Sequence, residues 1–314
     1  MKPNAAEPGG RAGRERGAPA RGWWGLVPAL LLLLLAACTR TTMPLPGNMS
    51  APVDNTQVLE PTIAWATVGT ASDELAVVWV EQGQTLPVRE TAGIAGAALG
   101  ELAPTQRSLR ATGNTTALGS SHWIEVSTPI GLIGWVPATS LTEFVSKESF
   151  CSDPNVLVLL DELRRVIADE DADGLLRLIS PKRDFILRLD FWNEEVRIAP
   201  DQMVGIFDDN RSYQWGTRFA SQTPIQGSFN EVIVPALSEV LDSDPQRACN
   251  ELLQGTSVAP VGWPDLYANL NYYSLLRRPS QGGNPFNWRT WVIAFEYIEG
   301  RPYLALLVQL RPQV

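Results

Sequence analysis

Few side chains of this protein are suited to acid–base or nucleophilic catalysis. The 314 residues include one histidine, His122, and three cysteines, at positions 38, 151 and 249. An active site needs acid, base or nucleophilic groups held within hydrogen-bond reach of one another. No Gly-x-Ser-x-Gly or Ser-x-x-Lys motif accompanies the single histidine. We therefore expect a protein without enzymatic activity and without a cofactor.

The strongest pattern for a metal site is the acidic run Asp169-Glu170-Asp171-Ala172-Asp173-Gly174. Its Asp-x-Asp-x-Asp-Gly spacing matches the start of a calcium-binding EF-hand loop. Such a loop requires a bidentate glutamate at its twelfth position, where this chain has Ser180. An acidic turn between two helices explains the run better, and we predict no metal site.

Cys38 directly follows a leucine-rich apolar run, residues 23–37, which is preceded by five basic residues. The run is too short to span a bilayer, which takes about 20 residues, but it fits an export signal. Its end, Leu35-Ala36-Ala37-Cys38, resembles the lipobox of bacterial lipoproteins. The resemblance implies that residues 1–37 are a signal peptide, that Cys38 carries lipid, and that the protein is anchored at the extracytoplasmic face of the cell membrane. The alternative is an ordinary secretory signal with a chance cysteine.

Export would place Cys151 and Cys249 in an oxidising compartment, where two thiols tend to pair. We predict a disulfide between them; the alternative is two free, buried cysteines. The formal net charge of −9 disfavours binding to a phosphate backbone. We therefore expect no nucleic-acid partner.

The chain after Cys38 divides into a tether and a first domain. Residues 38–71 lack a helical or strand period and are rich in Thr, Pro, Asn and Ser, which is typical of a flexible tether. Residues 72–146 contain short alternating segments punctuated by Gly and Pro, which predicts a small all-β barrel or sandwich. The segments are residues 74–81, 86–89, 99–102, 108–112, 122–127 and 132–136.

This first domain resembles the bacterial SH3 (SH3b) family in three motifs. They are Leu86-Pro87-Val88-Arg89, His122-Trp123-Ile124-Glu125-Val126 and Gly134-Trp135-Val136-Pro137-Ala138-Thr139-Ser140-Leu141. The resemblance implies an SH3-like barrel that binds cell-wall peptide or glycan, with Arg89, Trp123 and Trp135 as candidates for the ligand groove. Two alternatives remain open: the barrel is a spacer without a ligand, and Trp135 packs in its core.

Residues 150–314 show the pattern of an α+β domain. Apolar residues at helical spacing predict a helix that begins at Pro154, with Asp153 as its N-cap, and a short second helix at 175–179. Further helices at 200–208 and 229–241 and a strand around Trp192 follow. A final hairpin of residues 288–298 and 302–310 completes the helix-then-sheet order.

Two weaker resemblances concern this second domain. Its helix pair and curved antiparallel sheet resemble the cone-like fold of the nuclear-transport-factor type. Residues 213–216, 224–229 and 287–291 resemble uncharacterised domains of bacterial extracytoplasmic lipoproteins, which implies no activity. Five tryptophans could stack on sugars, although core packing is the commoner use of Trp; they are Trp192, Trp215, Trp263, Trp288 and Trp291.

Together these patterns indicate a non-enzymatic, lipid-anchored extracytoplasmic protein whose barrel contacts peptidoglycan. One alternative is a cell-wall hydrolase with its cleft in residues 150–314. A glycosidase would need two carboxylates about 5–9.5 Å apart in such a cleft. The other alternative is a structural spacer or assembly lipoprotein.

Overall fold

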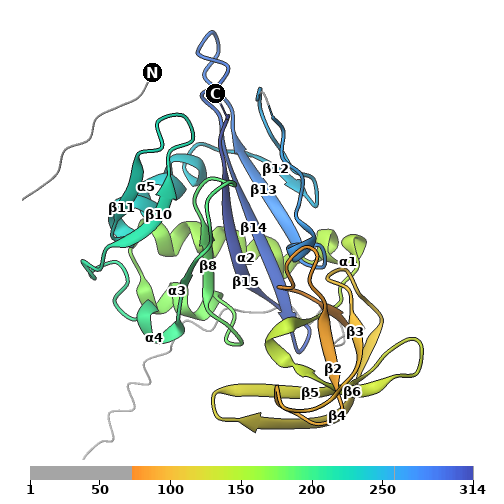
Figure 1. Ribbon diagram of the computed structural model, residues 1–314. Coiled ribbons are helices and arrows are strands. Elements are labelled where there is room, and N and C mark those ends of the chain that lie inside the picture. The colour runs from red at the N-terminus through yellow and green to blue at the C-terminus, as the bar shows by residue number, and fades with distance from the viewer. Residues whose placement is uncertain (1–72, 258, 314) are drawn as a thin grey trace, which may run out of the picture. The chain divides into compact units, whose positions relative to one another are not determined.

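The computed structural model describes residues 73–257 and 259–313, which belong to one compact unit. A curled, seven-stranded antiparallel sheet forms a half-barrel, and a mixed sheet with several helices follows it in the chain (Figure 1). The predicted order, an all-β part before a part with helices and sheet, is therefore confirmed. The predicted signal peptide, the tether and Cys38 lie outside the described residues.

The half-barrel has the strand order β3-β2-β6-β5-β4-β1-β7, with every neighbouring pair antiparallel. Its concave side buries small and branched apolar residues, among them Val77, Val88 and Val126. A 3₁₀ turn, Ala138–Ser140, precedes the last strand. The strands are β1 Glu74–Val77, β2 Leu86–Arg89, β3 Ala98–Leu102, β4 Leu109–Leu118, β5 Ser121–Ser127, β6 Ile133–Pro137 and β7 Leu141–Glu143.

The second part contains five helices and two sheets among the described residues. The helices are α1 Lys147–Ser152, α2 Pro154–Ala168, α3 Ala172–Leu178, α4 Pro200–Met203 and α5 Phe229–Leu241. The larger sheet has the order β12-β13-β14-β15-β8-β9, and β10 pairs with β11 separately. Its strands are β8 Phe185–Arg188, β9 Val196–Ile198, β10 Tyr213–Thr217, β11 Pro224–Gly227, β12 Gln246–Cys249, β13 Asn271–Arg277, β14 Arg289–Ile298 and β15 Arg301–Leu310.

Several predictions about these elements need correction. The helix predicted at 200–208 ends at Met203, and the helix predicted at 175–179 spans Ala172–Leu178. The larger sheet is not wholly antiparallel, because β8 pairs in parallel with β15. The chain enters β8 after α3, and this helix connection lets β8 run in the same direction as β15. Trp192 lies in the turn between β8 and β9 rather than in a strand. Asn193 fixes this turn, since its amide nitrogen donates to the carbonyl oxygen of Leu189 at 2.6 Å.

The helix starts follow from capping chemistry. Asp153 is the N-cap of α2 and its carboxylate accepts from the backbone N–H of Asn155, with Pro154 in the first helical position. Ser228 and Glu231 form a reciprocal capping box at the start of α5. Asp171 caps α3 through the backbone N–H of Gly174. These local signals explain why α2 and α5 begin where the sequence pattern predicts, whereas α3 begins at Ala172, three residues before its predicted start.

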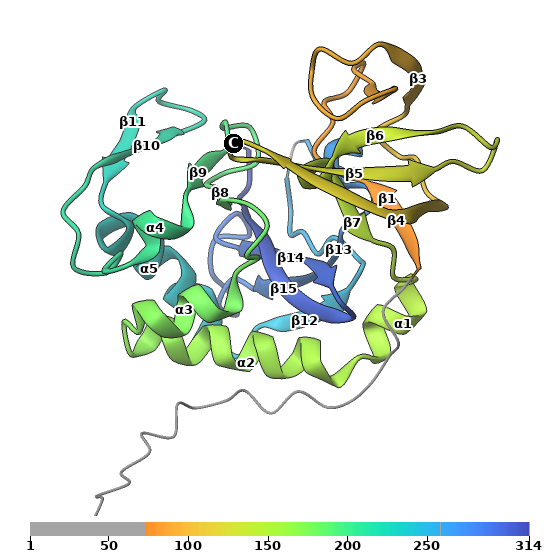
Figure 2. The same cartoon turned by 90° about the horizontal axis from the view of Figure 1, so that it is seen from below.

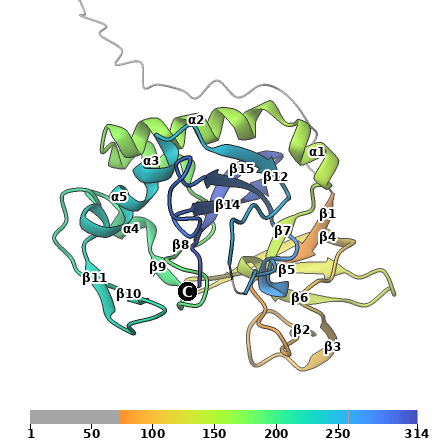
Figure 3. The same ribbon diagram turned by 90° about the horizontal axis from the view of Figure 1, so that it is seen from above.

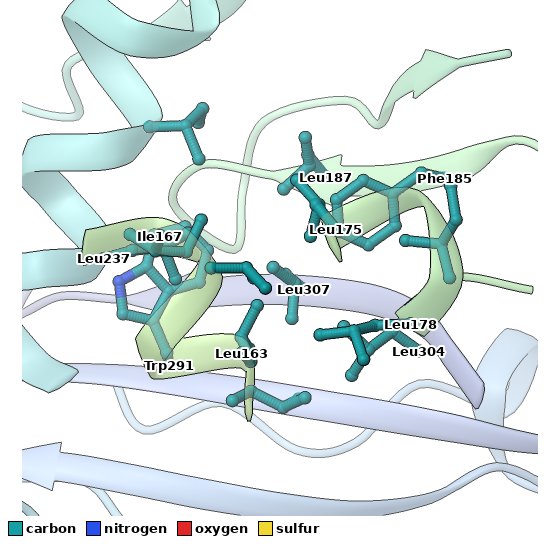
Figure 4. Close-up of a cluster of buried hydrophobic side chains, with 14 of the residues drawn as sticks. Leu163, Ile167, Leu175, Leu178, Phe185, Leu187, Leu237, Trp291, Leu304 and Leu307 are labelled. Atoms are coloured by element: carbon teal, nitrogen blue, oxygen red, sulfur yellow. The ribbon is translucent and has the colours of Figure 1, made fainter. Parts of the chain in front are cut away.

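The larger sheet is buried on both faces. Helices α2, α3 and α5 cover one face, where Leu163, Leu237 and Trp291 meet (Figure 4). Figures 2 and 3 show α2 running across this face of the sheet. The other face buries Trp288, Val292 and neighbouring residues. Trp288 and Trp291 are 1% and 0% exposed, so neither can offer a surface for stacking on sugar.

The half-barrel packs onto the second face of this sheet. Val78, just past β1, belongs to the same apolar cluster as Val292. The side chain of Asn269 donates to the carbonyl oxygen of Val77 at 2.8 Å and accepts from Nε of Arg107 at 2.6 Å. The half-barrel keeps a separate apolar core of its own, and it is joined to the larger sheet by the cluster around Val78 and by these hydrogen bonds.

Candidate functional site

The strand register places the three predicted groove residues on one face of the half-barrel. Arg89 on β2 lies opposite Trp135 on β6, and Trp135 lies opposite Glu125 on β5. Trp123 is one row further along β5, since residues two apart on a strand share a face. This face is the reverse of the one formed by Val126 and Val136. Trp135 is half-buried and lies outside the half-barrel core.

The polar groups of this row are held within the half-barrel. The guanidinium of Arg89 donates to the carbonyl oxygen of Gly96 at 2.7 Å. The carboxylate of Glu125 accepts from Thr112 and Asn114, both at 2.7 Å, and these bonds lower the pKa of Glu125. Because Arg89 bonds Gly96, it fixes the loop that follows β2, while Glu125 is held by residues of β4.

A cavity of about 480 Å³ opens beside Trp123, at the end of the half-barrel nearest the second part. Residues of β1, β4, β5, β7 and the 3₁₀ turn form its wall. Its lining includes Leu75, Trp123, Ile124, Leu141, His122 and Lys182. Arg89 and Trp135 do not line it, so the structure brings only one of the three predicted groove residues to this cavity.

Lys182 supplies the cationic group of the cavity. It lies in the loop between α3 and β8, and its backbone N–H donates to the hydroxyl of Ser180 at 3.1 Å. The next residue, Arg183, anchors this loop by donating to the carbonyl oxygens of Thr139 and Leu141 at 2.6 and 3.2 Å. The loop is thereby fixed against the half-barrel, and Lys182 is presented to the cavity wall.

Burial lowers the pKa of Lys182, and the nearby carboxylate of Glu296 opposes this shift only in part. The ammonium has one weak protein acceptor, the carbonyl oxygen of Leu141 at 3.5 Å. Trp123 is 5% exposed, so little of its ring is open to a ligand in the cavity. An apolar cavity with one poorly solvated cation can bind an apolar group that carries a negative charge.

The acidic run is explained by helix chemistry. Asp171 caps α3, and the guanidinium of Arg165 on α2 bonds both Asp169 and Asp171 at 3.1 and 3.2 Å. These contacts tie the turn between α2 and α3 to α2. Within residues 73–257 and 259–313, no group of three or more His, Cys, Asp or Glu side chains is placed to hold a metal ion.

The predicted disulfide between Cys151 and Cys249 is confirmed, and it joins α1 to β12. The side-chain amide of Asn250 lies against both sulfur atoms, at 3.7 and 3.8 Å. The same amide donates to Asn271 at 3.0 Å. Cys38, the predicted lipidation site, lies outside the described residues. In the part of the chain that is described, no helix has the length and apolar character needed to cross a membrane.

Comparison with known proteins adds no family to these observations. No protein-family model matches the chain, and no curated protein matches its sequence. The resemblances to lipoproteins and to SH3b domains therefore remain predictions from short motifs.

Sequence reasoning missed Lys182 as a site residue. One signal was available: after residue 37 the chain contains only two lysines, Lys147 and Lys182, and all its other cations are arginines. Nothing in the local pattern around Lys182 indicated that the side chain would meet Trp123, because the two residues come from different parts of the fold.

Proposed function

We propose that this protein is a non-enzymatic, lipid-anchored extracytoplasmic binding protein, and that it holds a cell-wall peptide in the cavity between Trp123 and Lys182. The observation that carries the proposal is the pairing of an apolar cavity with a single half-buried ammonium. Stem peptides of the cell wall combine small apolar side chains with free carboxylates, and a carboxylate would replace the water that Lys182 loses on burial.

A peptide fits this cavity better than a glycan does. Sugar recognition uses the open face of an aromatic ring together with many hydrogen-bonding groups. Trp123 is almost fully covered, and Leu75, Ile124 and Leu141 form much of the wall. Methyl groups of a peptide match such a wall, because burial of apolar surface contributes roughly 25 cal/mol per Å².

The finer description of the fold belongs to the same proposal. We infer that the half-barrel is an SH3b-like module and that the second part is a cone-like α+β domain similar to those of uncharacterised extracytoplasmic lipoproteins. The three motifs in β2, β5 and β6 support the first inference, and the helices that cover one face of a mixed sheet support the second.

Peptidoglycan binding tests the proposed cavity. The chain without residues 1–38 should co-sediment with purified sacculi, and Lys182→Gln should weaken this binding about tenfold or more, the loss of one charge-assisted contact. Lys147→Gln is the matched control, since Lys147 is the other lysine after residue 38 and lies on α1. Equal binding by both variants would contradict the proposed site. Release of soluble fragments from the sacculi would contradict a purely binding role.

Membrane fractionation tests the anchor separately. The intact chain should partition with membranes and incorporate labelled fatty acid, because two or more acyl chains give stable attachment. Cys38→Ala should abolish the labelling and release the protein from membranes. A Cys38→Ala protein that stays membrane-bound to the same extent would contradict lipid anchoring without affecting the peptide-binding test.

A further inference from the structure

Three arginines form a row across the helix-covered face of the larger sheet. Arg277 on β13 is the register partner of Arg289 on β14. The pairing of β14 with β15 aligns Thr290 with Leu310, so the next residues out, Arg289 and Arg311, also lie opposite each other. Like charges on directly opposite strand positions are destabilising. Such a row therefore requires negative partners.

In and around this row, guanidinium groups outnumber carboxylates. Asp190, which is fully buried, pairs with Arg311. Glu239 on α5 bonds Arg277 at 2.6 Å and is 3.9 Å from Arg289. A fourth arginine, Arg218, is exposed and forms no ion pair with any described residue.

A third carboxylate, Glu231, belongs to the capping box of α5, where it accepts from the backbone N–H of Ser228 at 2.8 Å. Four guanidinium groups thus face three carboxylates, and one positive charge is left over. Arg289 and Arg218 are the two guanidinium groups without a carboxylate oxygen closer than the 3.9 Å contact between Arg289 and Glu239. Arg289 is the less solvated of the two, with 22% of its side chain exposed.

A cavity of about 330 Å³ lies over this excess charge, between α5, β11 and the ends of β14 and β15. The carboxylates of Glu231 and Glu239, which are engaged as described above, line it together with Arg218, Arg289, Arg311 and Gln309. Leu189 and Ile225 are among its apolar walls. Gln309 lies opposite Trp291 and is 2% exposed, yet its side-chain amide has no hydrogen-bond partner among the described residues. Because Gln309 lines the cavity, its amide is an unused hydrogen-bond donor next to Arg289.

We propose that this cavity binds a small organic monocarboxylate. One carboxylate neutralises the one remaining charge, and its planar group suits bidentate contact with the Arg289 guanidinium. The amide of Gln309 donates to the same group, and Arg218 screens it from solvent at the mouth. The short carbon body of the ligand packs against Leu189 and Ile225.

The electrostatics of Arg289 agree with this assignment. Burial is the main cause that lowers the pKa of Arg289, and the positive charges of Arg311 and Arg277 add to the shift, while Glu239 opposes it. The charged form of Arg289 is therefore destabilised by its surroundings. A bound anion would stabilise the charged form of Arg289 and offset part of this cost.

Anion-dependent thermal stabilisation tests the proposal on the chain without residues 1–38. Millimolar sodium butyrate should raise the melting temperature relative to sodium chloride of the same ionic strength, since a ligand that binds only the folded state stabilises it. Arg289→Gln should raise the dissociation constant about tenfold or more. Arg218→Gln, at an exposed position, should weaken binding in the same direction even if the Arg289 variant folds poorly.

Two controls keep the outcomes distinct. Arg247→Gln removes an exposed arginine that pairs with Asp161 on another surface and should leave butyrate binding unchanged. Lys182→Gln should also leave it unchanged, which separates this site from the peptide-binding cavity. The proposal is overturned if butyrate acts no differently from chloride, if both arginine variants respond as the parent does, or if inorganic phosphate binds and butyrate does not.

Discussion

Lys182 and Arg183 are consecutive cations with different surroundings. Arg183 is 6% exposed and its guanidinium bonds both carboxylate oxygens of Glu296, at 2.7 and 2.8 Å. It also donates to two carbonyl oxygens of the half-barrel. Lys182 has one weak acceptor and faces a cavity. At the scale of single residues, one cation is used for structure and the other remains available to a ligand.

A titration of the two lysines checks the state of Lys182. In the chain without residues 1–38, reductive methylation with ¹³C labels only Lys147, Lys182 and the terminal amine. We expect the Lys182 signal to titrate below the ordinary lysine value of about 10.4, because burial disfavours the ammonium. At pH values between the lowered pKa of Lys182 in the folded state and its ordinary pKa in the unfolded state, the unfolded state binds more protons. The free energy of unfolding should therefore rise with pH in this range. A midpoint at or above the ordinary value would contradict the prediction.

Arg183→Met should strongly destabilise the fold, because it leaves the carboxylate of Glu296 buried without its partner. Removal of one member of a buried ion pair costs about 3–5 kcal/mol, which urea unfolding would measure. Arg164→Met is the matched control: Arg164 pairs with Asp242 at 3.3 Å on the surface, and such pairs contribute about 0–1 kcal/mol. A double variant with Glu296→Leu should recover much of the loss. Similar costs for both single variants would show that the buried pair is not stabilising.

At the scale of elements, local signals predicted the starts of α2 and α5 better than the extent of the strands or the length of α4, which ends at Met203 rather than at residue 208. The predicted helix at 229–241 is observed unchanged as α5, and α2 begins at Pro154 as expected. The predicted strand at 108–112 extends to Leu118 in β4, and β7 was not predicted. Helix caps are set by contacts within a few residues. Strand lengths depend on partners far away in sequence, such as the pairing of β1 with β7.

The disulfide is the covalent link between two elements, α1 and β12, whose cysteines are 98 residues apart. A cross-link that closes a loop of this length should stabilise the fold by about 4–5 kcal/mol on the chain-entropy account. The double variant Cys151→Ser with Cys249→Ser should therefore unfold at a lower urea concentration than the parent. Reductant should shift the parent to the midpoint of the variant and leave the variant unchanged. An equal midpoint for oxidised parent and variant would contradict the prediction.

At the scale of the whole molecule, the half-barrel and the second part behave as one body in the described structure. Val78 completes the apolar cluster on one face of the larger sheet, and Asn269, Asn271 and Arg183 bond backbone carbonyls of the half-barrel or the segment that follows it. Separation of the two parts would expose Val78 to water and break these hydrogen bonds. The predicted boundary near residue 147 therefore marks a change of architecture within a single body.

Calorimetry measures this coupling. We expect a single unfolding transition with equal calorimetric and van't Hoff enthalpies for the chain without residues 1–38, because the two parts share buried contacts. Arg183→Met should lower the melting temperature of that single transition. Two resolved transitions in the parent, with only one of them shifted by the variant, would show that the parts unfold independently.

The amino-acid sequence by itself determined the local features: the cap at Asp153, the helix periods of α2 and α5, the final hairpin and the pairing of Cys151 with Cys249. These depend on chemistry within a few residues or on a count of two thiols. Only the tertiary structure decided that Lys182 meets Trp123 and that Arg277, Arg289 and Arg311 form one row. Both arrangements depend on the register and packing of elements distant in sequence, which no local pattern encodes.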